Sequence, residues 1–331
     1  MREMTNSQCI LNNGFASAHC DAKPLFSIHC ELVISLMATL LELVGNTPLV
    51  ELNRLTAAAD RTNPNVKLYG KLEGNNPGGS VKDRAAYSMI RGYIDRGEWQ
   101  PGMKLIEATS GNTGIALAMI ATLFGIEIEL ALPANSTKER VQTMEAFGAK
   151  VTLTETIEAG RDYVEAKAAT GEFLLVDQFA NPDNYLAHYR TTGPEIWRDT
   201  AGQITHFVAS MGTTGTIMGT SMYLKEQNPD VQIIGCQPTD GSSIPGIRKW
   251  PTEYLPKIFD PKRVDRIMEV SQEEATQMTR ELARIEGVFA GMSSGGGVHA
   301  ALRLASELES GVIVCIICDR GDRYLSSGLF A

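Results

Sequence analysis

From Val66 onward, short apolar runs alternate with longer stretches in which apolar residues recur at helical spacing. The strand-like runs are Lys67–Leu72, Lys104–Ala108, Glu127–Leu132, Lys150–Thr154, Leu174–Gln178, His206–Ser210, Val231–Gln237 and Val312–Cys318. The stretches predicted to be helical are Val81–Arg96, Thr113–Phe124, Thr137–Phe147, Thr216–Gln227 and Gln272–Glu286. Many of the strands are continuous in Val, Ile and Leu, which is typical of sheets covered on both faces. The repeated β-α-β units predict an α/β fold with mostly parallel sheets.

The composition is that of an ordinary globular protein, and it excludes several classes of partner. The chain has 331 residues, enough for two lobes with separate cores, and 43% of them are hydrophobic. Its net charge of −9 argues against nucleic acid and anionic membranes as partners. No apolar run reaches the roughly 18 residues needed to span a bilayer. Six cysteines are too few for a disulfide scaffold at this length, so we expect a reducing, cytoplasmic compartment.

The first 36 residues lack the periodic pattern of the rest of the chain. They contain the steps His19-Cys20 and His29-Cys30, whose spacing matches no common structural zinc site, so we predict no metal. A signal peptide is disfavoured because the apolar stretch arrives late and is interrupted by Glu31 and Glu42. We expect residues 1–36 to be an N-terminal extension that is disordered or not native.

Lys82 follows a segment rich in Asn, Pro and Gly and stands just inside a predicted helix. A lysine in this place can present its amine at the floor of a cleft. There it can form a Schiff base, a chemistry that recurs in proteins that use pyridoxal phosphate (PLP). A single lysine is more often a solvated surface charge, so this prediction depends on the segments that accompany it.

Three further segments stand at predicted strand-to-helix junctions, namely 109–113, 212–216 and 291–295. In α/β folds, ligands bind outside the carboxyl ends of strands and beside helix N-termini. Lys82 opens a predicted helix of the same kind. We therefore expect the four segments to share one site.

One of these junctions is suited to a phosphate group; it reads Gly212, Thr213, Thr214, Gly215 and Thr216. Glycines let backbone N–H groups approach an anion, the threonine hydroxyls add donors, and the helix dipole favours negative charge. A plain strand-to-helix turn is the alternative. The segment is neither a Walker A sequence nor a G-x-G-x-x-G sequence, so nucleotide binding is disfavoured.

A second junction offers donors for a small carboxylate; it reads Thr109, Ser110, Gly111, Asn112 and Thr113. Hydroxyl groups, backbone amides and one side-chain amide meet there at the start of a helix. On their own, Ser110 and Asn112 are more often helix caps than ligands.

Together with 71–77, 243–254 and 316–326, these segments resemble the β-family (fold type II) PLP enzymes. Within that group the chain is similar to the cysteine synthases, or O-acetylserine sulfhydrylases, of the B subgroup, from about Leu41 to Phe330. The resemblance implies the tryptophan synthase β-like fold, with two three-layer α/β lobes and the site between them. Residues 74–188 would form the smaller mobile lobe with the substrate loop. Residues 37–73 and 189–331 would form the larger lobe with the phosphate loop.

The resemblance also implies a role for individual residues. PLP would be bound by Lys82, by Asn112 at its ring hydroxyl, by residues 212–216 at its phosphate, and by Ser293 at its pyridine nitrogen. The loop 109–113 and Gln178 would hold the substrate carboxylate. A neutral hydroxyl partner leaves the pyridine nitrogen largely unprotonated, which favours β-elimination over transamination. Ser294 adjoins Ser293, and only alignment separates the two.

Two assignments stay open. Cys318 occupies a place held by a cysteine in the B subgroup, and it either shapes the sulfur-donor pocket or is a buried structural cysteine. Arg248 and Lys249 could hold an anionic co-substrate such as thiosulfate, or they could be solvated surface charges.

The resemblance implies a homodimer that makes cysteine or S-sulfocysteine from O-acetylserine and sulfide or thiosulfate, with Lys82 as general base. Other β-family reactions, cystathionine formation or serine/threonine dehydration, would share the lysine and the phosphate loop. A non-catalytic PLP-binding scaffold is the alternative from a different class.

Overall fold

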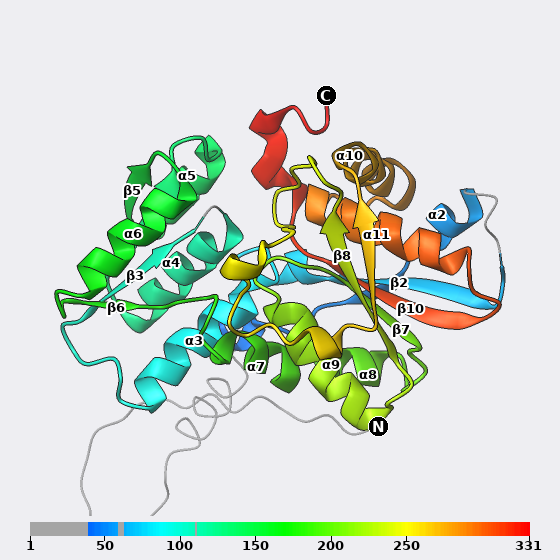
Figure 1. Ribbon diagram of the computed structural model, residues 1–331, viewed down its shortest axis with the longest axis horizontal. Coiled ribbons are helices and arrows are strands. Elements are labelled where there is room, and N and C mark those ends of the chain that lie inside the picture. Colours follow the sequence, from blue (N-terminus) through cyan, green and yellow to red (C-terminus); the bar gives the residue numbers. More distant parts are fainter. Residues whose placement is uncertain (1–38, 59–62, 110) are drawn as a thin grey trace, which may run out of the picture. The chain divides into compact units, whose positions relative to one another are not determined.

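The computed structural model describes residues 39–58, 63–109 and 111–331, and residues Leu40–Ala331 form one compact unit. The extension 1–36, its His-Cys steps and Ser110 therefore lie outside the described residues. The described strands form two sheets flanked by helices (Figure 1). The predicted α/β fold with mostly parallel sheets is confirmed, because only one of the strand pairs described in these two sheets is antiparallel.

The four-stranded sheet is entirely parallel, in the order β5-β4-β3-β6. Its strands are β3 (Lys104–Ala108), β4 (Ile128–Pro133), β5 (Lys150–Thr154) and β6 (Phe173–Leu175), and its helices are α3 (Lys82–Asp95), α4 (Asn112–Phe124), α5 (Lys138–Ala146) and α6 (Ile157–Ala168). Neighbouring residues of β3 belong to different cores. Leu105 packs with α3 and α4, whereas Ile106 packs with Val164 of α6. The sheet is thus covered on both faces, as its continuous apolar strands require.

The six-stranded sheet has the order β1-β2-β10-β7-β8-β9, with only β1 antiparallel. Its strands are β1 (Leu49–Glu51), β2 (Val66–Leu72), β7 (His206–Ser210), β8 (Gln232–Pro238), β9 (Arg266–Val270) and β10 (Gly311–Ile317). The helices around it are α2 (Asn53–Ala58), α7 (Asp183–Arg190), α8 (Thr192–Asp199), α9 (Gly215–Gln227), α10 (Gln272–Glu281) and α11 (Met292–Ala305). Figure 1 shows α10 and α11 on one face of this sheet and α8 and α9 on the other.

Several predicted boundaries were wrong, and each has a local cause. The strand predicted over Leu174–Gln178 is only Phe173–Leu175, because the chain turns at Asp177, whose φ is +51°. The helix predicted over Gln272–Glu286 ends at Glu281 and continues as a π-helix, Leu282–Glu286. The junction before α11 is not a strand; an isolated bridge between Ala290 and Arg320 stands there.

The fold places three predicted loops at helix N-termini. Lys82 begins α3, Asn112 begins α4 and Gly215 begins α9. Gly111 follows shortly after the carboxyl end of β3, and Gly212 follows the carboxyl end of β7. In the part of the chain that the structure describes, no helix is long and apolar enough to cross a membrane.

Candidate active site

One pocket brings together most of the predicted site residues. It encloses about 480 Å³ of empty space and is lined by Lys82, Asn112, Gly212, Thr213, Thr214, Thr216, Ser293 and Cys318, together with Val81, Ala209, Ser210, Gly246 and Ile316. These residues come from segments as far apart in the chain as Val81 and Cys318. The expectation that the four sequence segments share one site therefore agrees with the geometry.

Lys82 is the first residue of α3, and hydrogen bonds hold its own backbone N–H and that of Val81 before it. Its N–H donates to Ser80 Oγ at 3.2 Å, and the N–H of Val81 donates to the Cys318 carbonyl at 2.8 Å. Burial lowers the pKa of the Lys82 amine, while Cys318 and Asp319 raise it again. A buried lysine with a lowered pKa is more readily available as a neutral nucleophile.

A buried ionic cluster anchors the first turn of α3 behind Lys82. Arg84 donates to Glu73 at 2.7 Å and to Glu195 at 2.6 Å, and all three side chains are buried. Lys71, which is 0% exposed, contacts Glu195 at 2.9 Å. Arg84 and Lys71 hold the pKa of Glu195 at about 2, although its burial opposes this. Removal of one partner would leave an uncompensated buried charge, so the cluster fixes the place where α3 begins.

The loop Gly212–Thr216 fits a phosphate group on two observations. Thr214 Oγ1 is buried and has no hydrogen-bond partner, although a buried hydroxyl is normally satisfied. The two glycines also have no room for a side chain. A Cβ atom at residue 212 would lie 2.8 Å from the Gly246 carbonyl oxygen, and one at residue 215 would lie 2.0 Å from Asn184 Oδ1. The two glycines thus let the loop pack closely against its neighbours, while Gly212, Thr213, Thr214 and Thr216 line the pocket at the start of α9, where backbone N–H groups and the helix dipole favour an anion.

Two residues of α7 that the sequence did not single out form hydrogen-bond contacts with this loop. The amide of Asn184 donates to Thr213 Oγ1 at 3.3 Å and to the Gln178 carbonyl at 2.7 Å. The buried ring of His188 lies 3.3 Å from Thr216 Oγ1 and 2.8 Å from Thr192 Oγ1. Burial, together with the charge of Arg84, lowers the pKa of His188 to about 3, so the ring is neutral at neutral pH.

The loop that was predicted to bind the substrate carboxylate, residues 109–113, lies at the start of α4, beside Gln178. The side chains of Thr109, Thr113 and Gln178 are buried, and Thr113 Oγ1 donates to Gln178 Oε1 at 2.8 Å. The Gln178 amide nitrogen donates to Glu107 Oε1 at 3.1 Å and to the Ala108 carbonyl at 3.3 Å. Gly111 is the N-cap of α4. The loop therefore joins Gln178 in one hydrogen-bonded unit, as a shared carboxylate site would require.

The carboxyl-terminal segment holds the side chain of Asn112 in place. Asn112 Nδ2 donates to Asp319 Oδ2 at 2.6 Å, and Arg323 donates to Asn112 Oδ1 at 2.6 Å. Arg323 also donates to the carbonyl of Gly78, in the loop that leads to Lys82. Tyr324 OH donates to Asp319 Oδ2 at 2.5 Å. Sequence reasoning missed Asp319 and Arg323 because both lie more than 200 residues from Asn112, although they belong to the quoted segment 316–326.

The two adjacent serines differ in their surroundings. Ser293 lines the pocket, and its carbonyl accepts a hydrogen bond from Ser210 Oγ at 2.7 Å. Ser294 Oγ accepts the N–H of Cys318 at 2.9 Å. Cys318 also lines the pocket, and burial raises the pKa of its thiol to about 12. It is thus a neutral thiol at neutral pH.

Arg248 and Lys249 do not line the pocket that contains Lys82. Both line a separate pocket formed by residues 238–244 and 247–249. Lys249 contacts Asp240 at 2.7 Å and Glu269 at 2.8 Å, as a surface charge would. The same loop does reach the site, because Gly246 lines the pocket and the Trp250 side chain donates through Nε1 to the Gly212 carbonyl at 2.7 Å. The assignment of Arg248 to a donor pocket stays a prediction.

Comparisons with known proteins agree with this arrangement. Residues 40–319 match the family model described as pyridoxal-phosphate dependent enzyme. The chain is 59% identical over 295 residues to cysteine synthase B of Pseudomonas aeruginosa, covering 88% of this chain and 97% of that protein. It is 56% identical to cysteine synthase B of Escherichia coli K12, covering 89% and 96%. The crystal structure of a cysteine synthase from Entamoeba histolytica superposes with a TM-score of 0.84 at 34% identity, covering 96% of this chain and 94% of that chain.

Proposed function

The chain belongs to the family of pyridoxal-phosphate dependent enzymes, and from that premise we propose that it is a cysteine synthase of the B type. It replaces the acetoxy group of O-acetyl-L-serine with sulfur from sulfide or thiosulfate, and it releases acetate with cysteine or S-sulfocysteine. The observation that carries this proposal is the single pocket lined by Lys82, by the loop at the start of α9 and by Ser293.

The residues fit PLP in three places. The orphan hydroxyl of Thr214 and the glycine backbone at 212 and 215 suit its phosphate, Ser293 suits its pyridine nitrogen, and Asn112 suits its ring hydroxyl. Bound PLP supplies an electron-withdrawing ring that stabilises negative charge at the substrate α-carbon. Until the substrate binds, Lys82 would hold the cofactor covalently through its amine, whose lowered pKa suits this role.

The remaining residues bind the substrate and move its proton. Thr109, Gly111, Thr113 and Gln178 hold the substrate carboxylate, which places the α-carbon near the Lys82 amine. That amine accepts the α-proton and later returns it. Loss of the acetoxy group at the β-carbon leaves a position that sulfide or thiosulfate attacks. We also propose that Cys318 borders the space where the sulfur donor enters.

Three features of the organisation belong to the same proposal. Residues 74–188 act as the smaller lobe, which moves on substrate binding against the lobe of residues 37–73 and 189–331. The enzyme works as a homodimer in the cytoplasm. Its small-molecule substrates enter the pocket lined by Lys82.

Sequential mixing of the holoenzyme tests the function. O-acetyl-L-serine should shift the visible absorption band of the bound cofactor, and sulfide or thiosulfate should restore it as cysteine or S-sulfocysteine appears by mass spectrometry. Lys82→Ala should abolish product formation, because it lacks the amine that accepts the α-proton. Efficient turnover of homocysteine with serine, or of threonine alone, with no response to O-acetyl-L-serine, would show that another reaction of the family is the true one.

A further inference from the structure

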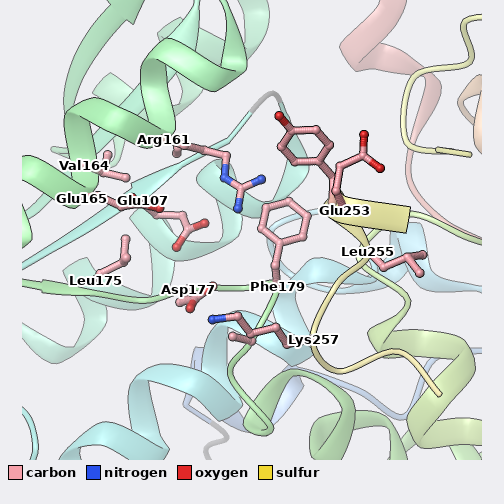
Figure 2. Close-up of a pocket in the computed structure, with 13 residues that line it drawn as sticks. Glu107, Arg161, Val164, Glu165, Leu175, Asp177, Phe179, Glu253, Leu255 and Lys257 are labelled. Carbon is pink, nitrogen blue, oxygen red and sulfur yellow. The ribbon is translucent and has the colours of Figure 1, made fainter. Parts of the chain in front are cut away.

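A second pocket lies beside the substrate loop but is lined by other residues, and we call it the Glu107 pocket. It encloses about 710 Å³ of empty space and is lined by Glu107, Arg161, Asp177, Phe179, Glu253 and Lys257, among others. Figure 2 shows the carboxyl group of Glu107 and the guanidinium group of Arg161 pointing toward the space beside Phe179. Nothing in the proposed reaction uses this space.

Glu107 has an unsatisfied oxygen in this pocket. Its side chain is 3% exposed, and its Oε1 accepts the Gln178 amide at 3.1 Å. Its Oε2 is buried and has no hydrogen-bond partner. Because a buried carboxyl oxygen is costly to leave unpaired, a donor brought by a ligand would be favoured there.

Two cations, Arg161 and Lys257, also line this pocket. Within the described chain, neither Arg161 nor Lys257 forms an ion pair, although both line the pocket. Arg161 lies over the ring of Phe179 at 5.3 Å, which fixes its guanidinium group at the wall. The acids Glu165, Asp177 and Glu253 line the pocket as well. The pocket thus offers both signs of charge, and Val164, Leu175 and Leu255 add apolar surface.

We propose that the Glu107 pocket binds a small α-amino acid as a zwitterion. The ammonium group donates to Glu107 Oε2, and the carboxylate pairs with Arg161 and Lys257. The side chain of the ligand packs against Phe179. The parallel N–H donors of the Arg161 guanidinium group suit a carboxylate, and the buried acceptor Glu107 Oε2 suits an ammonium group.

Occupancy of this pocket affects the substrate loop through Gln178, a step that rests on the proposed function. Both N–H groups of the Gln178 amide are engaged, one by Glu107 Oε1 and one by the Ala108 carbonyl. A substrate carboxylate must draw one of them away. An ammonium group at Oε2 favours the ionised form of Glu107, which holds the amide more strongly. The ligand and the substrate therefore weaken each other's binding reciprocally.

The probe for this site is N,N-dimethylglycine, whose tertiary amine keeps one N–H and a carboxylate but cannot form a Schiff base. We expect calorimetry to detect binding to the wild-type holoenzyme and at least tenfold weaker binding to Arg161→Gln. Thr113→Val alters the substrate loop and reaches the pocket only through Gln178, so it should change binding far less than Arg161→Gln does. Arg91→Gln, on the surface of α3, is the matched control and should bind normally.

The opposite pattern overturns the proposal. If Thr113→Val weakens binding and Arg161→Gln does not, the probe occupies the substrate site; absence of binding to the wild type overturns the proposal equally. In the second arm, dimethylglycine should raise the KM for O-acetyl-L-serine in the wild type and not in Arg161→Gln. If the probe binds through Arg161 but does not change the KM for O-acetyl-L-serine, the ligand site is supported and its coupling to the substrate loop through Gln178 is refuted.

Discussion

Arg323 joins two segments of the proposed cofactor site, so its replacement by Met makes a sharp prediction. The guanidinium group donates to Asn112 Oδ1 at 2.6 Å and to the Gly78 carbonyl, and the residue is 6% exposed. Met preserves most of the side-chain length and removes both donors. Asn112 would then keep only its hydrogen bond to Asp319, and Gly78 would lose a partner in the loop that leads to Lys82.

The magnitude follows from the two lost hydrogen bonds. A hydrogen bond to a charged group contributes about 1.5–3 kcal/mol, so Arg323→Met should lower the free energy of unfolding by about 3 kcal/mol. PLP binding should be affected through Asn112 alone. Loss of one oriented hydrogen bond, about 1.4 kcal/mol, predicts a roughly tenfold higher Kd for PLP.

The assay needs both measurements on the same proteins. Denaturant unfolding of the apoprotein gives the stability, and titration of the apoprotein with PLP gives the Kd. Arg320→Met is the matched control, because Arg320 lies three residues away, is half-exposed and, among the described residues, forms an ion pair only with the surface acid Asp322, at 3.4 Å. It should stay within about 0.5 kcal/mol of the wild type. If the two variants behave alike, Arg323 does not position Asn112 and the reasoning fails.

Two further predictions concern the loop at the start of α9. In Gly215→Ala the new Cβ would lie 2.0 Å from Asn184 Oδ1, so the affinity for PLP should fall at least tenfold. The control Gly160→Ala, whose Cβ meets nothing closer than 3.2 Å, should keep the wild-type affinity. Equal affinities of the two variants would show that the Asn184 side chain moves aside without cost. His188→Gln tests pH dependence. Burial holds the pKa of folded His188 at about 3, below 6.5 in the unfolded chain, so its contribution to stability is complete above pH 6.5 and is lost as pH falls toward 3. The stability advantage of the wild type over His188→Gln should shrink by about 1.4 kcal/mol per pH unit in this window, and a constant difference between pH 7 and 5 would contradict a buried neutral ring.

The buried strands could be predicted from the sequence because their apolar runs leave few alternatives. The predicted strands Lys104–Ala108 and His206–Ser210 coincide with the largely buried β3 and β7. Lys150–Thr154 also coincides with β5, although that edge strand has no buried residue. The edge strand β9 was missed because Arg266 and Glu269 interrupt its apolar pattern and are exposed. Helices α7 and α8 were missed for a related reason. Their buried faces include polar residues such as Asn184, His188 and Glu195, whose hydrogen bonds and ion pairs appear only in the folded chain.

The candidate site, too, could be predicted from the sequence only in part. Glycine-rich junctions and Lys82 could be recognised from their order along the chain, since each loop lies at the start of a helix. The residues that hold them could not. Asp319 reaches Asn112 across 207 positions, and Asn184 links Gln178 with Thr213 through one amide group. Such contacts depend on how the two sheets are placed, which no local pattern encodes.

The account depends most directly on Lys82 as the residue that carries PLP. Borohydride reduction of the holoenzyme, followed by proteolysis and peptide mass mapping, should place the pyridoxyl-phosphate mass on the peptide that contains Lys82. Lys82→Ala should bind PLP without becoming labelled. A label on any other lysine, or labelling that persists in Lys82→Ala, would contradict the account.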